Sequence, residues 1–283
     1  MIYGYRQTCR LVLAAAVFFT AVAQLAGHED IEKQIRSITE RLQSDPKNAT
    51  LYLKRAELHR QHEAWKQALS DFEIAEKVDP SLPGVTLGRA RVAFDRGQDE
   101  ASLELVDKLL KQDPGHVPAL LLRARCFASL NRPAEAKSAY DAFLAKCETP
   151  LPEHYVERAE AVAAAGKASL PEAIRSLDEG IRQLGDLASL HTRALEFEQK
   201  SGDQPAALVR VRRFLEVNPN HVPWLVYKGE ILAELGRRDE ARAACREARL
   251  AIRKLPAQRR RSAAMEDILV KINTLEATMA GAK

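Results

Sequence analysis

Apolar residues recur along this chain three and four positions apart, the spacing of one helix face. A dipeptide marks the larger period, with spacings of 34, 34, 35, 35 and 35 residues: Arg55-Ala56, Arg89-Ala90, Arg123-Ala124, Arg158-Ala159, Arg193-Ala194 and Lys228-Gly229. If each repeat is numbered from seven residues before its Ala or Gly, column eight is always small and columns four and eleven are mostly apolar. These three columns share one face, so they predict a first helix in each repeat.

A second helix follows in each repeat. About twelve residues past column eight stands another small residue: Ala68, Ser102, Ala136, Ala173, Ala207 or Ala241. Four residues further comes a larger side chain: Phe72, Val106, Tyr140, Leu177, Val211 or Cys245. Between the two helices lie residues that readily adopt a left-handed backbone: Gly97, Asn131, Gly166, Gly202 and Gly236. Each repeat is therefore predicted to be a helical hairpin whose small residues allow close packing.

This pattern resembles the tetratricopeptide repeat family. The clearest unit, "LYLKRAELHRQHEAWKQALSDFEIAEKVDP", carries the family's residues in order: Tyr52, Ala56, Ala68, Phe72, Ala75 and Pro80. The resemblance implies an all-α fold, a right-handed superhelical solenoid of about six hairpins. Departures are Ser102 in a small column, a two-residue insertion in "GKASLPEA" and one extra residue near Ser201.

The repeats divide the chain into four segments. We expect a signal peptide over residues 1–23, then a linker and N-terminal capping helix over 24–48. The repeat array covers 49–253, with repeats starting near residues 49, 83, 117, 152, 187 and 222. A C-terminal capping helix and tail occupy 254–283, and the apolar spacing there predicts one trailing helix from Pro256 to Met279.

The first segment has the features of an export signal. Arg6 and Arg10 precede an apolar run over residues 11–23 that ends in Ala21 and Ala23. Thirteen apolar residues are few for a membrane-spanning helix, which needs about 20. We expect a periplasmic or extracellular protein; the alternative is a membrane anchor formed by an uncleaved N-terminal segment.

The cysteines and the charged residues do not indicate a reactive site. Beyond the signal segment, Cys126, Cys147 and Cys245 form no CxxC pair and are expected to be small buried residues. From Pro205 onward, 16 Lys or Arg face 9 Asp or Glu, and Arg259 to Arg261 form a basic triplet. This basic C-terminal region could contact a membrane surface or an acidic partner. Nucleic acid is disfavoured because no aromatic residues lie among the basic ones.

No catalytic motif is found, and we expect no catalytic residue, no metal and no cofactor. The nearest constellation is His59, His62 and Glu63, but His59 occupies a packing column and no third ligand is placed by the sequence. The basic residue before column eight could form a charged binding ladder. In the resembled family it is usually structural, and we expect Arg55 to pair with Asp71.

In the resembled family the first helices line a concave groove. Columns five and nine, together with a neighbouring Phe, combine an aliphatic row with mixed charges, which suits a peptide or an amphipathic helix of a partner. The candidate partner-binding residues are Leu53, Glu57, Leu87, Arg91, Phe94, Leu121, Arg125, Glu160, Val226 and Glu230. Column five could equally pack between repeats.

The sequence thus predicts an exported scaffold or adaptor that binds a protein or peptide of unknown identity and performs no catalysis. One alternative is a structural envelope subunit that associates with itself. Another is an enzyme whose site is not recognised. The oligomeric state is not predicted.

Overall fold

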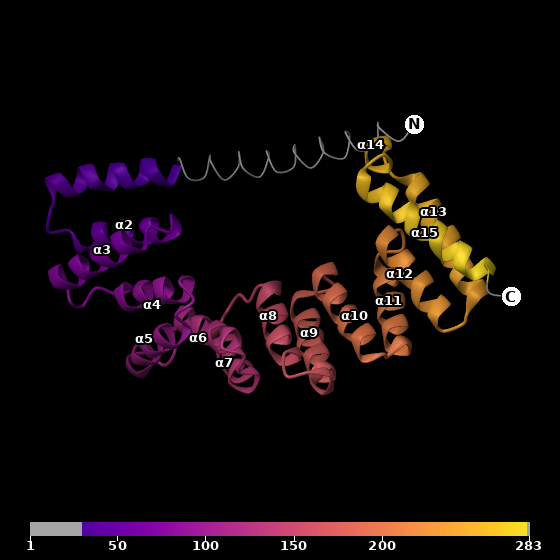
Figure 1. The fold of residues 1–283 in the computed structure, drawn as a ribbon, viewed down its shortest axis with the longest axis horizontal. Helices are drawn as coiled ribbons and strands as arrows, with labels where there is room; N and C mark the ends of the chain where they lie inside the picture. Colours follow the sequence, from indigo (N-terminus) through magenta and orange to yellow (C-terminus); the bar gives the residue numbers. More distant parts are fainter. Residues whose placement is uncertain (1–29, 282–283) are drawn as a thin grey trace. The chain divides into compact units, whose positions relative to one another are not determined.

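The computed structural model describes residues 30–281, which form helices and short connections with no strand among them (Figure 1). The expected all-α class is confirmed. A leading helix covers residues 30–44. It is followed by α2 (Ala49–Gln61), α3 (Trp65–Val78), α4 (Val85–Asp95), α5 (Asp99–Gln112), α6 (Val117–Ser129), α7 (Pro133–Lys146), α8 (Pro152–Ala163), η1 (Lys167–Ser169), α9 (Leu170–Leu184), α10 (Ala188–Ser201), α11 (Gln204–Val217), α12 (Val222–Glu234), α13 (Arg238–Lys254), α14 (Ala257–Arg260) and α15 (Ala263–Gly281).

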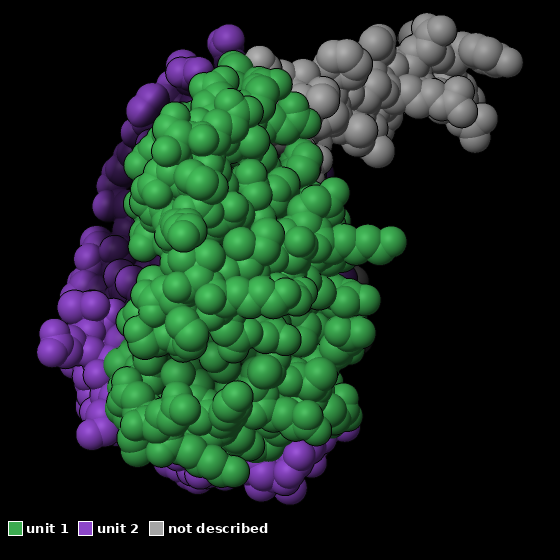
Figure 2. Space-filling model, turned by 90° about the vertical axis from the view of Figure 1, so that its left-hand side faces the viewer, with its two compact units in different colours: residues 1–130 green, residues 131–283 purple. Residues whose placement is uncertain are grey.

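The chain forms two compact units, residues 1–130 and 131–283, which Figure 2 shows in separate colours. In the first unit, α2 pairs with α3 and α4 pairs with α5, while α6 packs on α4 and α5. In the second unit, α7 packs on α8, and the pairs α8–α9, α10–α11 and α12–α13 follow in order. Each unit is thus a row of helices in which sequence neighbours are also packing neighbours.

The small columns explain how closely the helices of a pair approach. Ala56 and Ala68 face the interior of the first pair, and both are fully buried. Ser102 departs from the Ala of the other repeats and is buried as well, yet its Oγ donates to the carbonyl oxygen of Ala90 at 2.9 Å. A serine is tolerated in this column because its hydroxyl has a backbone acceptor.

The turns that follow the first helices use the left-handed backbone region that the sequence indicates. Gly97 has a φ of 69° and Asn131 a φ of 52°. In the first pair, Glu63 occupies the turn with a φ of 57°, a conformation that L-residues with long side chains adopt rarely. The predicted insertion in the fourth repeat coincides with η1, a short 3₁₀ turn between α8 and α9.

Both ends of the array are covered by further helices. The Arg55 guanidinium donates to Thr39 Oγ1 at 3.1 Å, which joins the leading helix to α2. At the other end α15 packs on α12 and α13. The prediction of a single trailing helix is wrong, because Arg261 and Ser262 separate α14 from α15. The stretch "AQRRRS" has no large apolar side chain to pack, so nothing holds it in line with α15.

The predicted signal peptide, residues 1–23, lies outside the described residues. Across residues 30–281, no helix combines the length and the apolar character that a membrane crossing requires.

Candidate functional site

The first helices of the first unit carry most of the predicted partner-binding residues. We call this surface the first-helix face; its residues are Leu53, Glu57, Leu87, Arg91, Phe94, Leu121 and Arg125, contributed by α2, α4 and α6. It is continuous, because α2 contacts α4 and α4 contacts α6. Six of these side chains are half-buried, whereas Leu87 is only 7% exposed and belongs to the core.

An ion-pair network crosses this face from α2 to α4. The Glu57 carboxylate accepts a hydrogen bond from Arg60 Nε at 2.9 Å and lies 3.7 Å from Arg91 Nη1. Arg60 also pairs with Asp95 at the end of α4, at 2.5 Å. Phe94 and Leu53 pack at the edges of the core clusters on either side. The face therefore offers apolar patches beside charges that are already oriented.

The other candidate residues lie in the second unit and do not form one surface of the same kind. Val226 is 4% exposed and packs in the core, so it offers little area to a partner. Glu160 forms an ion pair with Arg193 at 3.1 Å, between α8 and α10. Burial raises the pKa of Glu230 on α12, where Lys271 partly compensates the charge.

The basic residue before column eight is an ion-pair partner in every repeat. Each of these side chains has at least one acidic partner, at these N–O distances: Arg55 with Asp71 at 2.7 Å, Arg89 with Glu76 at 2.9 Å, Arg123 with Asp107 at 3.0 Å, Arg158 with Glu179 at 2.9 Å, Arg193 with Glu196 at 2.5 Å and Glu160 at 3.1 Å, and Lys228 with Glu247 at 2.8 Å. The expected Arg55–Asp71 pair is confirmed. Because each cation is engaged within the fold, the column is structural and not a ladder of free charges.

The histidines of the first hairpin do not converge. His59 Nε2 lies 3.8 Å from Asp71, whereas His62 Nε2 lies 3.8 Å from Glu32 of the leading helix. Burial lowers the pKa of His59. Between residues 30 and 281, no group of three or more His, Cys, Asp or Glu side chains is arranged to hold a metal ion.

The basic triplet Arg259 to Arg261 lies on and directly after α14, and all three side chains are exposed. Their exposure is compatible with an acidic partner or a membrane surface but selects neither.

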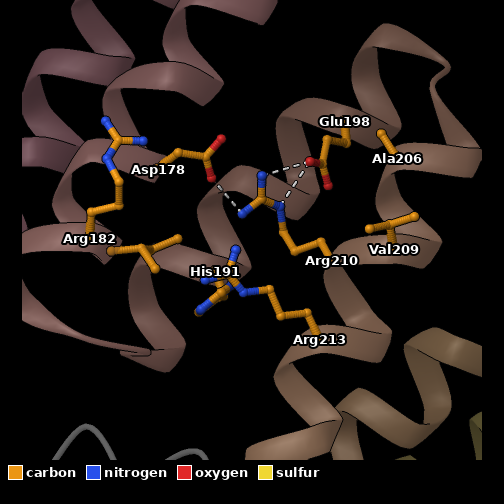
Figure 3. Close-up of a pocket in the computed structure, with 9 residues that line it drawn as sticks. Asp178, Arg182, His191, Glu198, Ala206, Val209, Arg210 and Arg213 are labelled. Carbon is orange, nitrogen blue, oxygen red and sulfur yellow. Dashed lines mark hydrogen bonds and ion pairs between the residues drawn. The ribbon is translucent and has the colours of Figure 1, made fainter.

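A pocket that the sequence did not predict lies between α9, α10 and α11 (Figure 3). It encloses about 590 Å³ and is lined by Asp178, Ile181, Arg182, His191, Glu198, Ala206, Val209, Arg210 and Arg213. In its centre, Arg210 donates to Asp178 Oδ1 at 2.9 Å and to Glu198 Oε1 at 2.8 Å. Glu198 is 4% exposed, and among the described residues its second oxygen, Oε2, finds no hydrogen-bond partner.

Two columns of the repeat contained a signal for this pocket. Column five is aliphatic in the other repeats but holds His191 in the fifth. Column twelve holds Ala in three repeats but Glu198 in the fifth. Both side chains are buried in the structure, and a buried polar group needs a partner, so these two departures within one repeat were the signal of a polar cluster.

Family comparison agrees with the helical pairs. Residues 53–117, 87–149 and 198–257 match a family model described as a tetratricopeptide repeat, and together they cover more than half of the chain. No curated protein sequence matches the chain.

Several solved structures are similar in fold. The C-terminal part of a TPR repeat-containing protein from Cytophaga hutchinsonii is 13% identical over 80% of this chain and 92% of that one, with a TM-score of 0.64. A tetratricopeptide repeat protein from Parabacteroides merdae is 15% identical over 94% and 99%, with a TM-score of 0.52. MamA from Desulfovibrio magneticus is 14% identical over 61% and 96%, with a TM-score of 0.51.

Proposed function

Because the chain belongs to the tetratricopeptide repeat family, a fold that serves as a protein-interaction scaffold, we propose that it is a non-catalytic adaptor that binds a protein or peptide partner. The observation that carries this proposal is the first-helix face. Half-buried Leu53, Phe94 and Leu121 lie there beside the network of Glu57 and Arg91. Apolar anchors next to oriented charges are what an amphipathic helix or an extended peptide requires.

Changing Leu121 and Arg125 together to Glu should abolish binding of the partner while the fold persists. Both side chains are half-buried on α6, so the change removes an anchor and reverses a charge on the face. Hydrophobic anchors often contribute about 2 kcal/mol or more, so affinity should fall by roughly thirtyfold or more. The full chain would capture partners from an envelope extract, and mass spectrometry would quantify them.

The matched control is Lys66→Glu with Leu69→Glu on α3, a second helix of the same unit. It likewise reverses one cation, here an exposed one, and replaces a half-buried leucine. Circular dichroism should give similar helicity and melting for the two double variants. Equal recovery of the partner by both would place the binding surface elsewhere. If light scattering found oligomers, and the capture experiment recovered only further copies of this chain, the result would favour a self-associating structural subunit over an adaptor.

We also propose that the chain is exported, on the basis of Arg6, Arg10 and the apolar run before Ala23. When the full chain with a C-terminal tag is expressed in a Gram-negative bacterium, the periplasmic fraction should contain protein that begins at Gln24. Intact-mass measurement checks this result. Tagged protein that retains Met1 and stays with the membrane would instead support the uncleaved anchor.

A further inference from the structure

The pocket between α9, α10 and α11 has a floor of fixed side chains. Arg210 is held from two sides by Asp178 and Glu198. His191 is buried and lies 3.0 Å from Asp186 through its Nε2, and its ring packs edge-on against Phe214 at 5.3 Å. These contacts hold the floor in one arrangement.

Two buried atoms on this floor can accept hydrogen bonds, but no donor within residues 30–281 reaches them. Glu198 Oε2 is one of them. Burial lowers the pKa of His191, which favours the neutral ring, and the carboxylate of Asp186 beside Nε2 favours the tautomer that carries its proton there. Nδ1 is then an acceptor, and it is the second atom without a partner. A buried acceptor without a donor is unfavourable, so the floor favours a ligand that brings an N–H or O–H group.

The rim of the pocket has the opposite character. Arg182 of α9 and Arg213 of α11 are exposed, and in residues 30–281 neither has an ion-pair partner. Figure 3 shows the Arg213 side chain extending toward His191. Val209, which is 67% exposed, adds an apolar contact at the same rim. The rim therefore suits a carboxylate with an apolar side chain next to it.

We propose that this pocket binds an acidic segment of the protein partner, with a carboxylate between Arg182 and Arg213, a neighbouring apolar side chain on Val209, and a backbone N–H directed at Glu198 or His191. This proposal rests on the scaffold function and names the chemistry of what is bound. A peptide supplies the acceptor and the donor in one segment. Phosphate supplies mainly acceptors, which the carboxylates of Asp178 and Glu198 would repel.

Binding can be followed with a tryptophan that touches the floor. Trp224 packs edge-on to His191 at 6.0 Å and stacks on Phe214 at 4.1 Å, and the chain has 2 tryptophans. In the full chain with Trp65→Phe, Trp224 is the sole tryptophan reporter. The probe is the terminally blocked peptide Gly-Glu-Val-Glu-Gly. The control peptide Gly-Gln-Val-Gln-Gly lacks the carboxylates, and inorganic phosphate is titrated separately as a competing anion.

The glutamate peptide should change Trp224 emission in a saturable way, with a Kd below about 1 mM, and the glutamine peptide should bind at least tenfold more weakly. Arg182→Gln with Arg213→Gln should weaken the glutamate peptide at least tenfold. The control Arg246→Gln with Arg253→Gln removes two exposed arginines of α13 for which the described residues 30–281 provide no ion-pair partner, and it should leave binding unchanged.

Three results would overturn the proposal: no saturable change with the glutamate peptide, equal binding of phosphate, or full binding after the loss of Arg182 and Arg213. The Leu121→Glu, Arg125→Glu variant should retain the peptide response, because it alters the other unit. Partner capture by that variant tests the scaffold function separately. The peptide titration can therefore contradict the pocket proposal without contradicting the scaffold proposal, and the reverse also holds.

Discussion

Replacing Gly88 with alanine should lower the free energy of unfolding of the first unit by about 1–3 kcal/mol. Gly88 lies in the first turns of α4, and a Cβ atom there would be 2.3 Å from Phe72 Cζ and 2.4 Å from Cε1. Phe72 is fully buried in the core of the first hairpin, so its ring has no free space to enter. Alanine is favoured over glycine within a helix by about 0.5–1 kcal/mol, which offsets only part of the clash.

Urea unfolding followed by Trp65 emission measures this effect, because Trp65 packs against the same core cluster. The matched control is Gly115→Ala, in the connection before α6, where the nearest atom to an added Cβ is Asp113 Oδ1 at 3.5 Å. That variant should unfold within about 0.5 kcal/mol of the parent. Adding Phe72→Leu to Gly88→Ala should cost less than the two single losses combined, since the smaller side chain relieves the clash. An unchanged midpoint for Gly88→Ala would show that α3 and α4 do not approach this closely.

The period of small residues is what made the fold predictable. Ala56 and Ala68 identify the two facing helices of the first hairpin, and they have no room for larger side chains. A turn such as Gly97 separates the helices because a residue that adopts positive φ ends a helix without strain. These requirements are local to each hairpin, so they recur from one sequence repeat to the next. A single sequence is therefore enough to detect them.

The Gly88–Phe72 contact was not predictable in the same way. Gly88 belongs to a column that holds Lys54 in the first repeat and Leu122 in the third, so the column has no consistent character. The need for glycine arises from the second helix of the preceding hairpin, which depends on how two pairs pack. Similarly, Leu87 is buried whereas Leu121 in the same column is half-buried, because burial depends on the neighbouring helices and not on the column alone.

The pocket between α9, α10 and α11 was not predicted, because its residues come from three helices. Glu198, Asp178 and Arg210 are each polar residues on amphipathic helices, and separately each could be solvent-facing. Only their convergence makes Arg210 the shared partner of two carboxylates. The charge of that buried arginine should therefore have a large effect on stability.

Arg210→Met should lower the free energy of unfolding of the second unit by about 3–5 kcal/mol near pH 7, the range for breaking a buried ion pair. Methionine keeps the length of the side chain but leaves Glu198 without its partner. The Asp178 side chain is 38% exposed and can be solvated, whereas that of Glu198 is 6% exposed and cannot. The unpaired Glu198 therefore accounts for most of the loss. Urea unfolding in the Trp65→Phe background, followed by Trp224 emission, measures it.

The loss should shrink as the pH falls. Burial already raises the pKa of Glu198 in the folded chain, and removing Arg210 raises it further. The folded variant then binds a proton at a pH where the unfolded chain does not, so its stability decreases as pH rises through that interval and recovers toward pH 5. Arg213→Met, the same change at an exposed position one turn away, should cost less than about 0.5 kcal/mol. Adding Glu198→Met to Arg210→Met should restore most of the stability at pH 7, because no charge is then left buried. A pH-independent loss that Glu198→Met fails to relieve would show that Arg210 acts through packing and not through its pairing with Glu198.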